Sequence, residues 1–138
     1  MTKQQSVFLL VEDNEDDAFF MQRAFQDAGL RNPLHIVTNG DQAIDYLAGS
    51  HAFADREKFP LPDFVFLDLK MPGRDGFDVL AWIRQEQKSK VPVAVLTSSP
   101  EETDRKLARE LGADCYLLKP PTSAMLLGCC RQFALECC

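Results

Sequence analysis

The sequence predicts an α/β fold in which helices cover both faces of a parallel sheet. Five short apolar runs recur along the 138 residues, and a segment with helical spacing of apolar residues follows each of them. The runs are nearly uninterrupted, as in strands buried on both faces, and several end on a polar side chain. With 46% hydrophobic residues the chain is able to bury a core, and we expect residues 1–138 to form one domain.

The first strand is expected over residues 7–11, and it ends abruptly at Glu12 and Asp13. Asn14 is a good helix cap, and acids at 15–17 suit the first turn of a helix because the helix dipole favours negative charge there. We therefore interpret Asp16 and Asp17 as helix-dipole acids and not as ligands. The helix then carries an inward stripe and stops at Gly29: Ala18, Met21, Phe25 and Ala28.

The second unit pairs a strand over 34–37 with a helix over 40–48, whose inward residues we expect to be Ala43, Ile44 and Leu47. Residues 49–62 then form a polar loop with two prolines. This loop is longer than ordinary connections, so we expect it to be either functional or mobile.

The central strand is expected at Phe64–Leu67, where the run is rich in aromatic and β-branched residues and ends on Asp68. Pro72, Gly73 and Gly76 force the backbone to turn there. An acid at the carboxyl end of a buried strand lies at the rim of the sheet, where open α/β folds keep their chemistry. A helix over 77–84 follows.

The last two units complete the pattern. A strand over 91–96 ends at Thr97, and Ser99 to Glu102 has the spacing of a capping box that starts a helix. That helix is charged and carries a thin apolar stripe: Leu107, Ala108 and Leu111. The fifth strand, 115–118, ends at Lys119, and the last helix has its core face at Leu126, Cys130, Phe133 and Cys137.

Right-handed crossovers leave few topologies for such a chain, and the flavodoxin-like strand order 2-1-3-4-5 is the favoured one. In that order the carboxyl ends of four strands meet at one edge of the sheet. Five polar side chains are then expected together: Glu12, Asp13, Asp68, Thr97 and Lys119.

Three carboxylates in one cleft repel each other unless cations neutralise them. Lys119 and one divalent cation would balance the charge, and carboxylates are ligands that Mg²⁺ prefers. Asp68 could then attack a phosphoryl donor, while Thr97 and Lys119 hold the transferred oxygens. The chain has no P-loop or Gly-rich nucleotide fingerprint, so the phosphoryl group would have to come from another protein or a small donor.

These residues, with Met71-Pro72 and Asp75-Gly76 after the acceptor, closely resemble bacterial response-regulator receiver domains along essentially the whole chain. The resemblance implies that Asp68 accepts phosphate from a sensor histidine kinase. It implies a site for Mg²⁺, or for Mn²⁺ or Ca²⁺ in its place, made by Glu12, Asp13, Asp68 and the main-chain oxygen of Lys70. Thr97 and Tyr116 correspond to the switch residues of the family, and Lys119 to its lysine. The Lys119–Pro120 bond is expected to be cis.

The long loop and the absence of an output domain are most similar to the small single-domain receivers that serve phytochrome-type kinases. The resemblance places output, by partner binding or as a homodimer, on the fourth helix, fifth strand and fifth helix. Lys70 stands two residues after the acceptor, where the family tunes phosphate lifetime, and Pro121 departs from the apolar residue often found after Lys-Pro.

Two other functions compete with the phosphorylated switch. A phosphohydrolase with Asp68 as nucleophile would need a second acid two residues later on the first strand, where this chain has Lys70 on the third. A receiver that acts only as a phosphate-independent binding module is disfavoured by the intact set of acids.

Composition sets further bounds. The net charge is −6 without a basic tract, which argues against nucleic-acid binding. No apolar run is long enough for a membrane span and no signal-peptide pattern is present, so we expect a cytoplasmic protein without a membrane partner. Four of the five cysteines fall in the last ten residues, and we interpret Cys130 and Cys137 as small core residues.

Overall fold

The computed structural model describes residues 5–135, which form a five-stranded parallel sheet in the order β2-β1-β3-β4-β5, as the sequence predicts. The strands are β1 (Phe8–Val11), β2 (Leu34–Val37), β3 (Phe64–Leu67), β4 (Val93–Thr97) and β5 (Cys115–Leu118). The helices are α1 (Glu15–Asp27), α2 (Gly40–Ala48), α3 (Gly76–Ala81), α4 (Glu102–Glu110) and α5 (Ser123–Gln132). A 3-10 turn, η1 (His51–Phe53), follows α2, and a π-helical stretch, η2 (Trp82–Glu86), continues α3.

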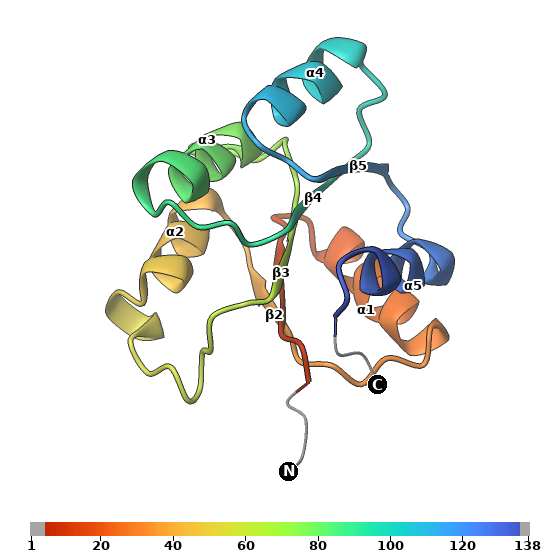
Figure 1. Cartoon of the computed structure of the whole chain (residues 1–138), viewed down its shortest axis with the longest axis horizontal. Helices are drawn as coiled ribbons and strands as arrows, with labels where there is room; N and C mark the ends of the chain where they lie inside the picture. The colour runs from red at the N-terminus through yellow and green to blue at the C-terminus, as the bar shows by residue number, and fades with distance from the viewer. Residues whose placement is uncertain (1–4, 136–138) are drawn as a thin grey trace.

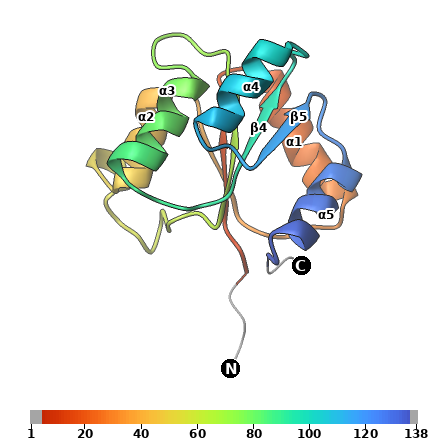
Figure 2. The ribbon, with the colours of Figure 1, turned by 45° about the horizontal axis from the view of Figure 1, so that its top comes forward.

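Helices cover both faces of the sheet, with α1 and α5 on one side and α2 and α3 on the other (Figures 1 and 2). The strands divide their side chains between two cores because neighbouring residues of a strand point to opposite faces. In β1, Leu9 and Val11 belong to the core under α2 and α3, whereas Phe8 and Leu10 belong to the core under α1 and α5. The buried strands therefore read as continuous apolar runs.

Four helices begin at a side-chain cap, which explains why their starts are readable from the sequence. Asn14, Asn39 and Thr122 each accept a hydrogen bond from a main-chain N–H in the first turn of their helix. Asp75 and Asp78 form a reciprocal capping box at α3.

The capping box expected at Ser99 is wrong. Helix α4 begins only at Glu102, and its N-cap, Glu101, makes no side-chain capping bond. The Ser99 hydroxyl instead donates to the carboxylate of Asp104, 2.7 Å away. Ser99 therefore lies before the helix and binds a side chain of its first turn, not a main-chain N–H. The expected inward stripe of α4 also needs correction: Ala108 is buried, but Leu107 is 42% exposed.

The loop over 49–62 packs against the domain through one arginine. The Arg56 guanidinium donates to the main-chain oxygens of Tyr46, Leu47 and Phe59 at 2.8–3.2 Å. The ring of Phe53 lies 5.2 Å from that of Tyr46, and Phe59 packs on both rings. The sequence shows the length of this loop but not its aromatic anchor.

The C-terminal helix buries Leu126 and Cys130, as expected, and also Cys129, which was not singled out from the sequence. Cys137 and Cys138 lie outside the described residues. Over residues 5–135, none of the helices has both the length and the apolar character that a membrane span requires.

Gly76 allows a test of how tightly the turn after Asp68 is packed. An added Cβ at residue 76 would meet the main-chain oxygen of Asp68 and lie 2.8 Å from the Cα of Leu69. We therefore expect Gly76→Ala to lower the free energy of unfolding by about 1–3 kcal/mol in urea titrations. Gly128→Ala is the matched control, because a Cβ there meets open space inside a helix, and should raise stability by about 0.5–1 kcal/mol. Equal stability of Gly76→Ala and the parent protein would contradict the packing argument.

Candidate functional site

The sheet brings the predicted side chains together at its carboxyl edge. β1 and β3 pair in parallel with Val11 opposite Leu67, so the residues that follow, Glu12 and Asp68, leave the sheet side by side. The main-chain N–H of Asp68 donates to the oxygen of Val11 at 3.1 Å, which extends the pairing by one step. Glu12, Asp68 and Thr97 are all buried. The expectation that separate strands deliver these groups to one place is confirmed.

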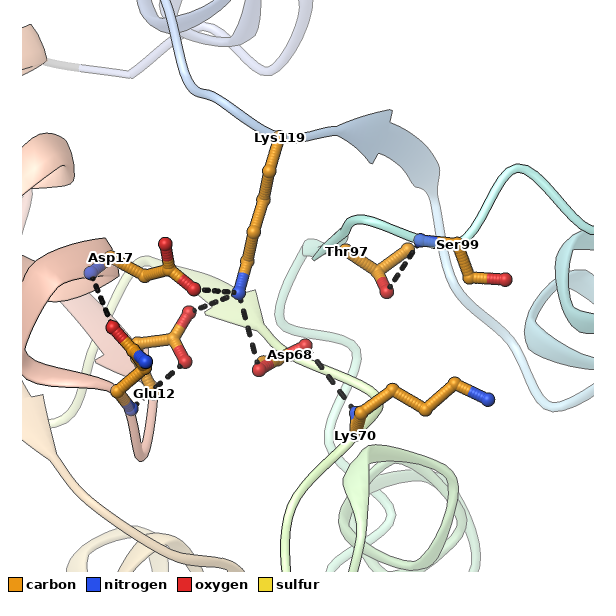
Figure 3. Close-up of polar contacts among 8 residues, drawn as sticks. Glu12, Asp17, Asp68, Lys70, Thr97, Ser99 and Lys119 are labelled. Atoms are coloured by element: carbon orange, nitrogen blue, oxygen red, sulfur yellow. Dashed lines mark hydrogen bonds and ion pairs between the residues drawn. The ribbon is translucent and has the colours of Figure 1, made fainter.

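Lys119 reaches into the centre of this edge from the end of β5 (Figure 3). Its ammonium nitrogen lies 2.6 Å from Glu12 Oε1 and 3.3 Å from Asp68 Oδ2, and its side chain is only 11% exposed. The Lys119–Pro120 peptide bond is cis, as expected from the sequence. One ammonium group therefore links β1, β3 and β5.

Asp17 is a member of the site that sequence reasoning missed. Its Oδ2 lies 2.8 Å from the Lys119 ammonium, and it comes from the first turn of α1, where its N–H donates to the Asn14 cap (Figure 3). The interpretation of Asp17 as only a helix-dipole acid is therefore incomplete. The available signal was its place in the chain, since α1 begins directly after the acids at the end of β1 and Asp17 lies in its first turn.

Glu12, Asp13 and Asp68 form a group that fits a divalent cation. One carboxylate oxygen from each lies within 4.8 Å of the others, and Asp13 is exposed while the other two are buried. The donor set consists of hard oxygens, as such cations prefer.

Thr97 and Tyr116 are connected through Ser99. The N–H of Ser99 donates to the Thr97 hydroxyl at 3.3 Å, and the Tyr116 hydroxyl donates to the Ser99 main-chain oxygen at 2.8 Å. The Arg105 guanidinium lies 4.7 Å from the centre of the Tyr116 ring, a cation–π contact. The two residues expected to act as switches thus share a neighbour in the β4–α4 loop.

Lys70 is held near Asp68 by its main chain but not by its side chain. Its N–H donates to Asp68 Oδ1 at 3.3 Å, whereas its ammonium points away from that carboxylate (Figure 3). The ammonium lies 3.5 Å from Asp104 Oδ2 on α4. The proposed role of its main-chain oxygen as a metal ligand stays a prediction.

The buried environment of the site changes the proton affinity of Glu12 and of Lys119. Burial, followed by the hydrogen bond and charge of Asp68, raises the pKa of Glu12 from 4.5 to about 7, although Lys119 works in the opposite direction. Burial alone would lower the pKa of Lys119, but its bonds to Asp17 and Glu12 outweigh this and raise it. Lys119 therefore stays charged, and Glu12 is the group of this site that titrates near neutral pH.

The raised pKa of Glu12 predicts a pH dependence of stability in metal-free buffer. In the folded protein Glu12 keeps its proton to higher pH than in the unfolded chain. Its contribution to the free energy of unfolding is therefore complete below pH 4.5 and is lost as pH rises through about 7. We expect the stability of the parent protein relative to Glu12→Gln to fall by up to about 3 kcal/mol across this interval. Urea unfolding with a chelator measures it, and parallel pH profiles of the two proteins would contradict it.

Comparison with known proteins agrees with this geometry. Response regulator Rcp1 of Synechocystis sp. is 37% identical over 114 residues, which are 82% of this chain and 76% of the relative. The structure of its Mn²⁺-bound form aligns with a TM-score of 0.77 at 33% identity and covers 95% of each chain. An acidic cluster together with this relative supports divalent metal binding at the site.

Two further structures are regulators named after phytochromes. The bacteriophytochrome response regulator AtBRR aligns with a TM-score of 0.83 at 30% identity, over 96% of this chain and 95% of its own. The phosphorylated cyanobacterial phytochrome response regulator RcpA aligns with a TM-score of 0.76 at 30% identity, over 93% and 90%. Residues 8–129 match the response regulator receiver domain family. The chain therefore belongs to the response-regulator receiver family of two-component signalling and is not a classical enzyme.

Proposed function

We propose that this protein is a phosphorylated switch in which Asp68 accepts a phosphoryl group from a sensor histidine kinase. The observation that carries the proposal is the position of the Asp68 carboxylate, with one oxygen 3.3 Å from the Lys119 ammonium and the group as a whole inside the acidic metal cluster. A carboxylate can accept a negatively charged phosphoryl group when cations neutralise the added charge, and here the Lys119 ammonium and the proposed metal ion would do so.

In the transfer, an Asp68 carboxylate oxygen forms a bond to phosphorus while the bond from phosphorus to the kinase histidine nitrogen breaks. Lys119 and the Thr97 hydroxyl would bind the phosphoryl oxygens, and Asp17 would keep the Lys119 ammonium in place. Mg²⁺ held by Glu12, Asp13, Asp68 and the Lys70 main-chain oxygen would supply charge neutralisation at these oxygens.

The names of the similar structures support a phytochrome-type kinase as the phosphoryl donor. We place the output of this chain on the surface made by α4, β5 and α5, because Tyr116 and Arg105 join that surface to Ser99 and Thr97. A downstream protein or a second copy of the chain would bind there more tightly in one phosphorylation state.

The phosphoacceptor is tested with acetyl phosphate or phosphoramidate and Mg²⁺, followed by intact mass. One phosphoryl adduct should form on the parent protein and should be absent in Asp68→Asn, because the amide is a poor nucleophile. Asp16→Asn is the matched control, since it removes an exposed acid from the same edge, and should still form the adduct. An adduct that persists in Asp68→Asn would refute the assignment. Steady turnover of phosphate esters would support the phosphohydrolase instead.

The metal site is tested by titration calorimetry with Mg²⁺. Asp13→Asn should weaken binding about tenfold or more, because it removes one of three carboxylates that approach the ion. Its effect on stability should be small since the side chain is exposed. Asp16→Asn should bind as the parent does, and unchanged affinity in Asp13→Asn would remove this acid from the site.

A further inference from the structure

Two side chains next to the site, those of Lys70 and Ser99, meet at the carboxylate of Asp104 on α4. Asp104 Oδ2 accepts a hydrogen bond from the Ser99 hydroxyl at 2.7 Å and lies 3.5 Å from the Lys70 ammonium. Lys70 comes from the loop after β3 and Ser99 from the loop after β4, so each is two residues beyond a residue of the proposed phosphoryl site. Asp104 is thus the point where both loops are attached to α4.

We propose that Asp104 is a positioning residue for Lys70: it holds the Lys70 ammonium away from Asp68 and thereby sets the lifetime of the phosphoryl group. This inference rests on the proposed function and adds to it a residue of α4 and a mechanism of regulation. Asp104 contacts Lys70 at the side-chain ammonium and not at the main-chain oxygen proposed as a metal ligand, so its influence is exerted through the Lys70 side chain.

Charge and reach explain why the two anions compete for one ammonium. Phosphorylation increases the negative charge on Asp68, and the main chain of Lys70 is already 3.3 Å from that carboxylate. Rotation about the flexible stem of the lysine is enough to turn its ammonium from Asp104 to the phosphoryl oxygens. The Lys70 side chain is 65% exposed, so its pair with Asp104 is weak enough to be exchanged.

Loss of the phosphoryl group gives this competition a measurable consequence. A water oxygen forms a bond to phosphorus, the bond from phosphorus to the Asp68 oxygen breaks, and inorganic phosphate leaves a free carboxylate. An ammonium lying on the phosphoryl oxygens hinders the approach of that water. Asp104 keeps the Lys70 ammonium off the phosphoryl oxygens for part of the time and so shortens the lifetime of the phosphoryl group.

The same contacts connect the chemistry to the output surface. When Lys70 leaves Asp104, the carboxylate loses its cation and keeps only the Ser99 hydroxyl. Ser99 also binds Thr97 through its N–H and Tyr116 through its oxygen. The position of Lys70 is therefore coupled to α4 by side chains that the proposed switch already uses, and a partner that pairs with Asp104 should lengthen the lifetime of the phosphoryl group.

A double-mutant cycle tests the inference. Each protein is loaded with acetyl phosphate and Mg²⁺, the donor is removed, and the decay of the adduct is followed by intact mass. Asp104→Asn keeps an acceptor for Ser99 and loses only the charge. It should lengthen the lifetime of the phosphoryl group about threefold, because loss of an exposed ion pair changes an equilibrium by about this factor. In a Lys70→Ala background the same substitution should change nothing, a pattern that a merely structural role of Asp104 would not produce.

Glu110→Gln is the matched control, since it removes the same charge from the exposed far end of the same helix, and its lifetime should equal that of the parent. An unchanged or shortened lifetime in Asp104→Asn, or an equal change with and without Lys70, would overturn the inference. Failure of the parent protein to form any adduct would instead reject the proposed function. The two failures are therefore distinguishable.

Discussion

The arrangement of the site depends on one buried ammonium group shared by three carboxylates. Lys119 lies within 3.3 Å of Glu12, Asp17 and Asp68, which come from the end of β1, the start of α1 and the end of β3. Without a cation these acids would repel each other; burial, and after it the neighbouring Asp68, already raises the pKa of Glu12 to about 7. The lysine thus holds together elements that are distant in sequence while leaving a net negative charge that a divalent cation would neutralise.

The fold prepares this meeting by register and close packing. β1 and β3 pair residue for residue up to Val11 and Leu67, so the acids that follow must emerge at the same level. At the turn after Asp68, Gly76 approaches the main chain so closely that a side chain would not fit. The position of the Asp68 carboxylate is therefore set by the backbone, and the surrounding side chains determine its charge environment.

A second group of contacts connects the carboxyl edge of the sheet to the surface of α4 and β5. Ser99 binds Thr97, Tyr116 and Asp104 with three different atoms, and Asp104 also reaches Lys70. Few of these contacts are strong, because several of the side chains are partly exposed. Weak and exchangeable contacts suit a switch, since a change of one charge at Asp68 is then enough to alter their balance.

The sequence by itself determined the strand order, the cap at Asn14, and the meeting of Glu12, Asp13, Asp68, Thr97 and Lys119. Hydrophobic period, capping chemistry and crossover handedness are local or topological rules, so they can be read along the chain. Only the tertiary structure decided that Asp17 binds Lys119, that Arg56 anchors the long loop, and that Ser99 binds Asp104 instead of capping α4. Each of these depends on where a flexible polar side chain finds a partner across the fold, and spacing in the sequence does not contain that information.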